Sequence, residues 1–270
     1  MGLLPQPFTM DFPTDTPLED IPEIHKTLKD TFRAGKLRSI SFRRTQLAQL
    51  AYLLQDNYVA FQEALFDDFG KHPIEANMGE LVTLFQRTLD AISNLDQWTA
   101  NVDLSSETSP MYAALNPVLI KQPRGPVLII GYVCEHKIDE LQTLFMNTWF
   151  SSPFNAPLLL NLQPLIGAIA AGCPAVIKPS DLSTQCSSLI FKLVHKYLDN
   201  DCYRVVLGGV DQATRLLDLK WGSGIYFFCL RPISLLIETS LCSLLYGWYK
   251  SWRYCCRCRR QTHDTCDTWG

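Results

Sequence analysis

Hydrophobic residues recur at helical spacing through the first hundred positions of the chain. Between Thr45 and Phe69, with Gly70 placed to end a helix, the stripe consists of Leu47, Leu50, Leu54, Phe61 and Leu65. A second stripe, from about Glu75 to Trp98, consists of Leu81, Phe85, Leu89, Ile92 and Leu95. Residues 1–35 precede both as an acidic, proline-containing arm that passes into a polar helix. The pattern predicts a helical layer whose apolar faces serve packing rather than chemistry.

The pattern changes after Pro117 to short apolar runs that alternate with helices. Residues 126–131, 175–177 and 203–206 are typical of buried parallel strands, and helices are predicted over 163–172 and 183–198. Alternating strands and helices favour right-handed βαβ crossovers. We therefore expect an α/β fold, with an N-terminal helical layer and a partial doubly wound, Rossmann-like parallel sheet. The GxGxxG fingerprint of many dinucleotide-binding sheets does not occur in the sequence.

Composition is that of a globular protein and restricts the partners. The 270 residues are 47% hydrophobic and carry a formal net charge of −3, which argues against a nucleic-acid surface. The acidic start lacks the basic region of a signal or transit peptide, so the expected location is cytoplasmic and the ten cysteines are expected to be reduced. No membrane span is expected, because Arg231, Pro232 and Glu238 interrupt the apolar stretch 225–249.

Three motifs occur in a specific order in the second half of the chain. They are PFNAP at 153–157, GAIAAGCPAVIKPSD at 167–181 and VVLGG at 205–209. Together they resemble the P-[WF]-N-x-P, G-A-I-A-A-G-N-x-V-V-x-K-P-S-E and V-V-x-G-G signatures of the aldehyde dehydrogenase superfamily. The resemblance spans roughly residues 25–228, includes the LFDDFGK segment at 65–71, and fits the fatty-aldehyde, class-3-like branch best.

The resemblance implies an enzyme that oxidises long-chain (fatty) aldehydes to carboxylic acids with NAD or NADP. Carried over by position, the residues implied to bind the cofactor are Ile130, Phe154, Lys178, Ser180, Asp181 and Gly209, and no metal is implied. Lys178 would donate hydrogen bonds to the adenosine ribose hydroxyls, and Asp181 stands where the family has a ribose-contacting Glu. Gly209 would let the backbone pass close to the adenine. Asn155 would donate its amide N–H to the oxyanion that forms when a thiolate attacks the aldehyde.

Outside its motif, each of these residues has an ordinary structural explanation. Lys178 alone would be a solvated lysine after a strand, Asn155 a loop residue that makes a turn, and Gly209 a glycine in an αL turn. The binding roles assigned to these residues therefore depend on the family motifs in which they lie.

Residues 132–152 interrupt the resemblance, because the family has no such segment between Gly131 and Pro153. Reverse translation permits GTATGT, a common start of an intron, across Gly131 to Val133, and an AG acceptor within Ser152. Removing the span keeps the reading frame and restores the family sequence I-I-G-P-F-N-A-P. We therefore predict a retained intron, with a genuine surface insertion loop as the alternative.

The tail at 229–270 departs from the family in a second way. It holds six of the ten cysteines and three of the six tryptophans. Shifting the codon frame by one base from Gly247 to Trp269 permits a sequence close to the family's T-V-G…A-A-A-K-H-L-T-P-V-T-L segment. This predicts an out-of-frame, unstructured tail. The chain then lacks the family's nucleophilic Cys and general-base Glu, and we expect it to have no aldehyde dehydrogenase activity.

The expected organisation is an arm at 1–35, a cofactor-binding domain at 36–228 that contains the insertion, and the tail at 229–270.

Other interpretations stay open beside the enzyme. One is a catalytically dead pseudoenzyme, which binds cofactor and forms a homo-oligomer or pairs with a full-length relative; another is the product of an incorrect gene prediction. A third is a nucleic-acid-binding zinc knuckle in the tail, whose CCHC-like ligands would be Cys255, Cys258, His263 and Cys266.

Overall fold

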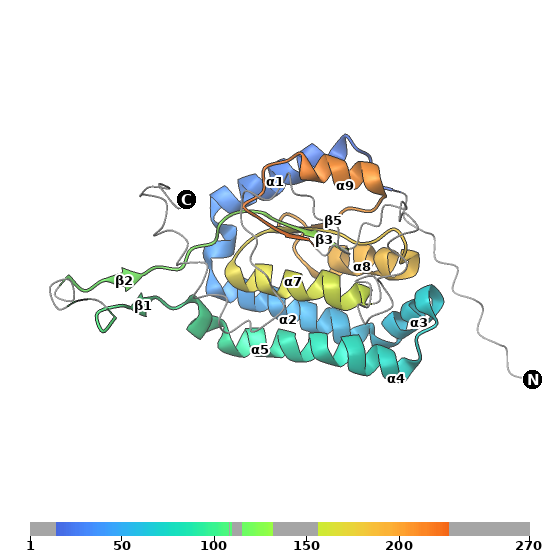
Figure 1. The fold of residues 1–270 in the computed structure, drawn as a ribbon, viewed down its shortest axis with the longest axis horizontal. Helices are drawn as coiled ribbons and strands as arrows, with labels where there is room; N and C mark the ends of the chain where they lie inside the picture. The colour runs from blue at the N-terminus through green and yellow to red at the C-terminus, as the bar shows by residue number, and fades with distance from the viewer. Residues whose placement is uncertain (1–14, 108, 110–114, 132–155, 227–270) are drawn as a thin grey trace, which may run out of the picture. The chain divides into compact units, whose positions relative to one another are not determined.

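Four short parallel strands form the sheet around which the described residues are arranged (Figure 1). The computed structural model describes residues 15–107, 109, 115–131 and 156–226. In the order β5-β4-β3-β6 the strands are Tyr203–Val205, Ala175–Lys178, Val127–Ile130 and Ser223–Tyr226. Ile130 is in register with Lys178, and Ile177 with Val205. The three predicted strands are therefore adjacent and parallel, whereas β6 is a strand that the hydrophobic pattern does not predict.

Helices cover both faces of this sheet, which confirms the doubly wound α/β class. One face carries α7 (Pro157–Ala171) and α8 (Thr184–Tyr197), and the other carries α1 (Asp20–Ala34) and α9 (Val210–Leu217) (Figure 1). Successive side chains of a strand point to opposite faces, so each strand contributes to two cores. Ile129 is buried with residues of α7 and α8, whereas Leu128 and Ile130 are buried with Leu28 of α1.

A further layer of helices packs on α7 and α8. Its elements are α2 (Ile40–Asp56), α3 (Tyr58–Phe69), α4 (Pro73–Ala76) and α5 (Val82–Thr99), with a 3-10 turn at Lys36–Arg38 and a π turn at Asn77–Leu81. The single helix predicted from Thr45 to Phe69 is wrong, because Asn57 leaves the helical region with φ −115° and ψ 24°. The apolar spacing does not reveal this break, since it continues in phase from Leu54 to Phe61. Gly70 ends α3 with φ 66°, as expected.

Two carboxylates of this layer hold the amino ends of α7 and α8. Glu80 is 1% exposed, forms an ion pair with Lys71 (2.5 Å), and accepts hydrogen bonds from the N–H groups of Leu158 (2.8 Å) and Leu159 (3.2 Å). Asp68 accepts bonds of 3.0 and 2.8 Å from two N–H groups in the first turn of α8. The first N–H groups of a helix have no intrahelical partner and its amino end is partly positive, so both contacts are favourable.

The Glu80 contact also explains why α7 begins at Pro157 rather than at the predicted Gln163. Proline is favourable at the first helical position, and the N–H groups that follow it are satisfied by Glu80. Glu80 lies 78 positions earlier in the chain than Leu158, so no local pattern predicts this start.

The remaining described strands, β1 (Val102–Asp103) and β2 (Val118–Leu119), form an antiparallel ribbon outside the main sheet. Several predicted features lie outside the described residues, namely the insertion at 132–152, Phe154, Asn155, and the tail at 229–270 with its CCHC-like side chains. Among the residues that are described, no helix has both the length and the apolar surface to cross a bilayer. The same residues contain no group of three metal-binding side chains.

Candidate functional site

The described residues of the predicted cofactor site lie at the carboxyl ends of β3, β4 and β5. Ile130 ends β3 and Lys178 ends β4, and the two are paired in the sheet. The N–H of Gly131 donates to the Lys178 carbonyl at 2.9 Å, so the pairing continues to this edge. Gly209 follows β5 in the next loop. Doubly wound sheets bind their ligands at this edge, so the topology places these residues where a cofactor site is expected.

Lys178 is a buried cation at the end of β4. Its side chain is 1% exposed, and Nζ donates to the Pro179 carbonyl at 3.3 Å. Burial lowers the pKa of the Lys178 ammonium, and the carboxylates of Asp181 and Asp15 oppose this shift. An ammonium has three N–H donors, so its hydrogen bond to Pro179 leaves donors that a ligand hydroxyl can use. Lys178 is therefore not the solvated lysine that its place after a strand would otherwise suggest.

Ser180 and Asp181 shape the turn between β4 and α8. Ser180 is 4% exposed; its Oγ accepts a hydrogen bond from the Leu182 N–H (3.2 Å), and its carbonyl accepts one from the Ser187 hydroxyl (2.7 Å). Asp181 is exposed, and its Oδ2 would lie 3.6 Å from a Cβ built on Gly209. The loops that follow β4 and β5 therefore lie close together, with the Asp181 side chain between them. The Ser180 hydroxyl is already engaged in a hydrogen bond within the turn.

Gly209, in the loop from β5 to α9, does not adopt the αL conformation that was the alternative explanation for this glycine. Gly208 has the positive φ, 136°, whereas Gly209 has φ −93° and ψ −139° and precedes the first residue of α9. The Gly209 N–H donates to Gln212 Oε1 at 3.0 Å. Gln212 therefore reaches back to fix the backbone at the point where Asp181 approaches.

An N-terminal segment reaches the same edge, which the sequence does not predict. Leu207 and Thr16 are joined by two hydrogen bonds of 3.0 Å, one from the Thr16 N–H to the Leu207 carbonyl and one from the Leu207 N–H to Thr16 Oγ1. Gln212 Nε2 donates to the Thr16 carbonyl at 3.3 Å. These contacts place Asp15 near Lys178, and they join residues almost 200 positions apart, for which no local signal exists.

Asn161 is a second residue that sequence reasoning misses. It lies in α7, is 2% exposed, and donates from Nδ2 to the Pro157 carbonyl at 2.7 Å. Its Oδ1 has no hydrogen-bond partner among the described residues and would lie 2.7 Å from a Cβ built on Gly131. The amide of a buried asparagine therefore faces the backbone where β3 ends. Its polar character within an apolar helix is the only signal in the sequence.

The described cysteines do not provide a nucleophile. Cys173, Cys186 and Cys202 are buried. Burial raises the pKa of all three thiols, that of Cys202 to about 12. A thiol must ionise to attack a carbonyl, so these side chains are structural at neutral pH.

Comparison with known proteins identifies the family. A model of the aldehyde dehydrogenase family matches residues 150–227. The chain is 33% identical over 206 residues to the beta-apo-4'-carotenal oxygenase of Neurospora crassa, and 35% identical over 196 residues to aldehyde dehydrogenase family 3 member I1, chloroplastic, of Arabidopsis thaliana. The chain belongs to the aldehyde dehydrogenase family. The matches cover 76% and 72% of this chain but 34% and 31% of the two relatives, so the chain spans about a third of their length.

Solved structures of aldehyde dehydrogenases share the fold. The substrate-bound Staphylococcus aureus AldH aligns with a TM-score of 0.63 at 30% identity, over 74% of this chain and 39% of that protein. Aldehyde dehydrogenase 21 of Physcomitrella patens aligns with a TM-score of 0.57 over 75% of this chain and 38% of its own; at 19% identity it supports the fold alone. The resemblance inferred from the three motifs is thus confirmed, and so is the α/β fold expected from it.

Proposed function

We propose that this chain is the cofactor-binding part of an NAD(P)-dependent aldehyde dehydrogenase of the fatty-aldehyde branch. The observation that carries the proposal is Lys178, a buried ammonium at the carboxyl edge of the sheet that interacts electrostatically with Asp181, whose carboxylate in turn approaches Gly209. A buried cation with free donor capacity needs polar partners, and ribose hydroxyls would supply them. The names of the relatives, family 3 dehydrogenases and an enzyme of carotenal, support a long-chain aldehyde as the substrate class.

We assign these residues to the adenosine half of NAD or NADP. Lys178 would donate to the ribose hydroxyls, Asp181 would accept from them, and the backbone at Gly209 would lie next to the adenine. Ile130 and Ser180, with Phe154 from outside the described residues, would complete the contacts that the family motif implies. When bound, the nicotinamide cofactor supplies the hydride acceptor for aldehyde oxidation. We place the protein in the cytoplasm, as a homo-oligomer or paired with a full-length relative.

Catalysis by the 270-residue chain itself is not part of the proposal. Asn155 would donate to the oxyanion of an attacked aldehyde. No cysteine of the sequence lies in the family's nucleophile motif, and the described thiols are buried with raised pKa values. We therefore propose a chain that binds cofactor without turnover, which makes the pseudoenzyme the favoured form of this function.

Equilibrium binding of NAD and NADP by calorimetry tests the proposal. We expect binding by the full chain that weakens by roughly tenfold or more in Lys178→Met, because hydrogen bonds to a charged donor are lost. Lys192→Met on α8 is the matched control, since Lys192 is exposed and lies on another element. Binding of AMP but not of nicotinamide mononucleotide would locate the contact at the adenosine half. Absence of NAD and NADP binding, or equal losses in both variants, would disprove the assignment.

A further inference from the structure

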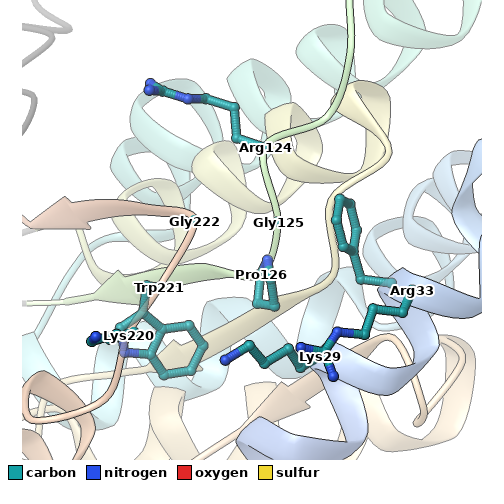
Figure 2. A pocket seen from close by; sticks show the side chains of 9 residues that line it. Lys29, Arg33, Arg124, Gly125, Pro126, Lys220, Trp221 and Gly222 are labelled. Atoms are coloured by element: carbon teal, nitrogen blue, oxygen red, sulfur yellow. The ribbon is translucent and has the colours of Figure 1, made fainter.

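A basic cavity lies at the opposite edge of the sheet, at the amino ends of β3 and β6 (Figure 2). Its volume is about 300 Å³, at the lower limit for small-molecule pockets. Basic and aromatic side chains dominate its lining, namely Lys29, Arg33, Arg124, Lys220, Phe32 and Trp221, and none of the described residues that line it is acidic. Four residues of β3 separate this edge from the carboxyl edge, a distance of about 13 Å at the usual rise per residue. The cavity is therefore separate from the proposed cofactor site.

One face of α1 forms a wall of this cavity. His25, Lys29 and Arg33 are spaced four residues apart, which places them one above another on the helix. Figure 2 shows the Lys29 ammonium pointing towards the indole of Trp221, with the Arg33 side chain extending from the next turn of the same helix. The side chain of Arg124 points away from this group in the same view. Two cations of α1 thus face the segment that leads into β6.

That segment is held in place by the buried end of the same helix face. His25 Nε2–H donates to the Lys220 carbonyl at 2.9 Å, and the His25 ring meets the Trp221 indole edge to face with centroids 4.6 Å apart. Trp221 Nε1–H donates to the Leu216 carbonyl at 2.7 Å. Contacts with His25 and with the Leu216 carbonyl therefore fix the indole on two sides. The indole forms a rigid aromatic surface beside the cations of α1.

The floor of the cavity is backbone brought close by two glycines. The Gly222 N–H donates to the Pro126 carbonyl at 2.9 Å. A Cβ on Gly222 would lie 2.7 Å from the Gly125 Cα and 2.8 Å from the Arg124 carbonyl, so no larger residue fits there. Gly125 itself has φ 135°, a conformation that other residues rarely adopt. Both positions keep the starts of β3 and β6 together under the cationic wall.

We propose that this cavity binds a small anion of the diphosphate class. Lys29 and Arg33 of α1 line the cavity together, and Arg33 Nη1 also lies 3.7 Å from Asp30 Oδ1, so a ligand with several charged oxygens is needed to contact both cations. Guanidinium groups bind phosphate in a bidentate manner, and lysines bind it as point charges. The chain as a whole has 27 acidic and 24 basic residues, whereas every ionisable side chain among the described residues that line the cavity is basic. The indole adds a stacking surface for the base of a nucleoside diphosphate.

Calorimetric titration of the full chain with pyrophosphate, and separately with ADP, tests this proposal at low ionic strength. The ADP titration uses the Lys178→Met background, so that the proposed adenosine site does not contribute. Equal affinities indicate that the diphosphate alone is recognised, and tighter binding of ADP indicates stacking on Trp221. Both support the site. Failure of pyrophosphate and of ADP to bind would overturn it, whether or not NAD binds at Lys178.

A double variant, Lys29→Gln with Arg33→Gln, locates the binding. We expect pyrophosphate affinity to fall by roughly tenfold or more, since charge-assisted hydrogen bonds are removed. Lys26→Gln with Lys192→Gln is the control, because both lysines are exposed, neither lines the cavity, and the net charge changes equally. Equal losses in the two double variants would show nonspecific charge attraction and contradict the site. Circular dichroism verifies folding, and if the double variant unfolds, Lys29→Gln with Lys26→Gln as its control makes the same test.

Discussion

At the scale of single residues, the buried charge of Lys178 favours binding of a polar ligand and lowers the stability of the folded chain. It is a cation with 1% exposure whose pKa is lowered by burial. The charged form is therefore less favourable in the folded chain than in the unfolded chain. This cost is present at pH values below the lowered pKa and fades as the pH rises towards 10.5, the ordinary value. A residue retained for packing alone would not need this charge.

Lys178→Met is therefore expected to keep or raise stability while it weakens cofactor binding. Methionine fills a similar volume without a charge, so the free energy of unfolding should be unchanged or higher by on the order of 1 kcal/mol at pH 7. The gain should shrink as the pH rises towards 10.5, because the folded wild type loses its buried charge before the unfolded chain does. Urea unfolding at several pH values measures this. A variant that is clearly less stable at pH 7 would mean that the ammonium has a structural partner.

A second prediction at this scale concerns Cys202, whose contribution to stability changes with pH in the opposite direction from that of Lys178. Its pKa is raised to about 12 by burial, above the ordinary value of 9.0, so the folded state holds the thiol proton more strongly. The resulting stability is fully present below pH 9 and is lost between about pH 9 and 12. Cys202→Ala should therefore lose less stability than the wild type between pH 8 and 11 in urea unfolding. Rapid alkylation of native Cys202 by iodoacetamide at pH 8 would contradict this account.

At the scale of elements, the contacts that position α7 and α8 come from another layer of the structure. Glu80 and Asp68 accept hydrogen bonds from the first N–H groups of these helices. Each helix directly follows a segment of the candidate site, so a shift of its amino end would move that segment. The helical layer therefore contributes to the site although none of its residues is proposed to touch the cofactor.

Asp68→Ala should lower the free energy of unfolding by about 1–2 kcal/mol, the usual cost of losing a helix cap. Asp67→Ala is the matched control, because Asp67 is its exposed neighbour in α3 and should change stability by less than about 0.5 kcal/mol. Chemical unfolding of both variants at pH 7 makes the comparison. Similar values for the two would show that the contact with α8 adds no stability.

At the scale of the whole molecule, residues 132–152 separate β3 from the family motif at 153–157. β3 ends at Ile130, in register with Lys178, directly before this span. We propose that the span is foreign to the fold, because its removal restores the family sequence. The charged residues Glu135, Lys137, Asp139 and Glu140 in this span have no counterpart in the family sequence that its removal restores.

Deleting residues 132–152, so that Gly131 joins Pro153, should give a more soluble chain that unfolds more cooperatively. The deletion restores the direct connection from the strand to the loop that precedes α7. NAD binding should persist and aldehyde oxidation should stay absent. Replacing the span with a Gly/Ser linker of equal length is the control that separates its sequence from its length. Lower soluble yield, or loss of a transition that the parent shows, would mean that the span is a structural element.

The sequence by itself determined the α/β class, three of the four strands of the main sheet, the C-cap of α3 and the family. These features depend on local period, turn residues and motifs that lie within a few positions of one another. Only the tertiary structure decided the break at Asn57, the start of α7 at Pro157, the burial of Lys178 and the approach of Thr16 to Leu207. The last three depend on partners far apart in sequence, and the break leaves the apolar period unchanged. Local spacing reports which face of an element is apolar, but it cannot report which distant group will satisfy a backbone N–H or exclude water from a charge.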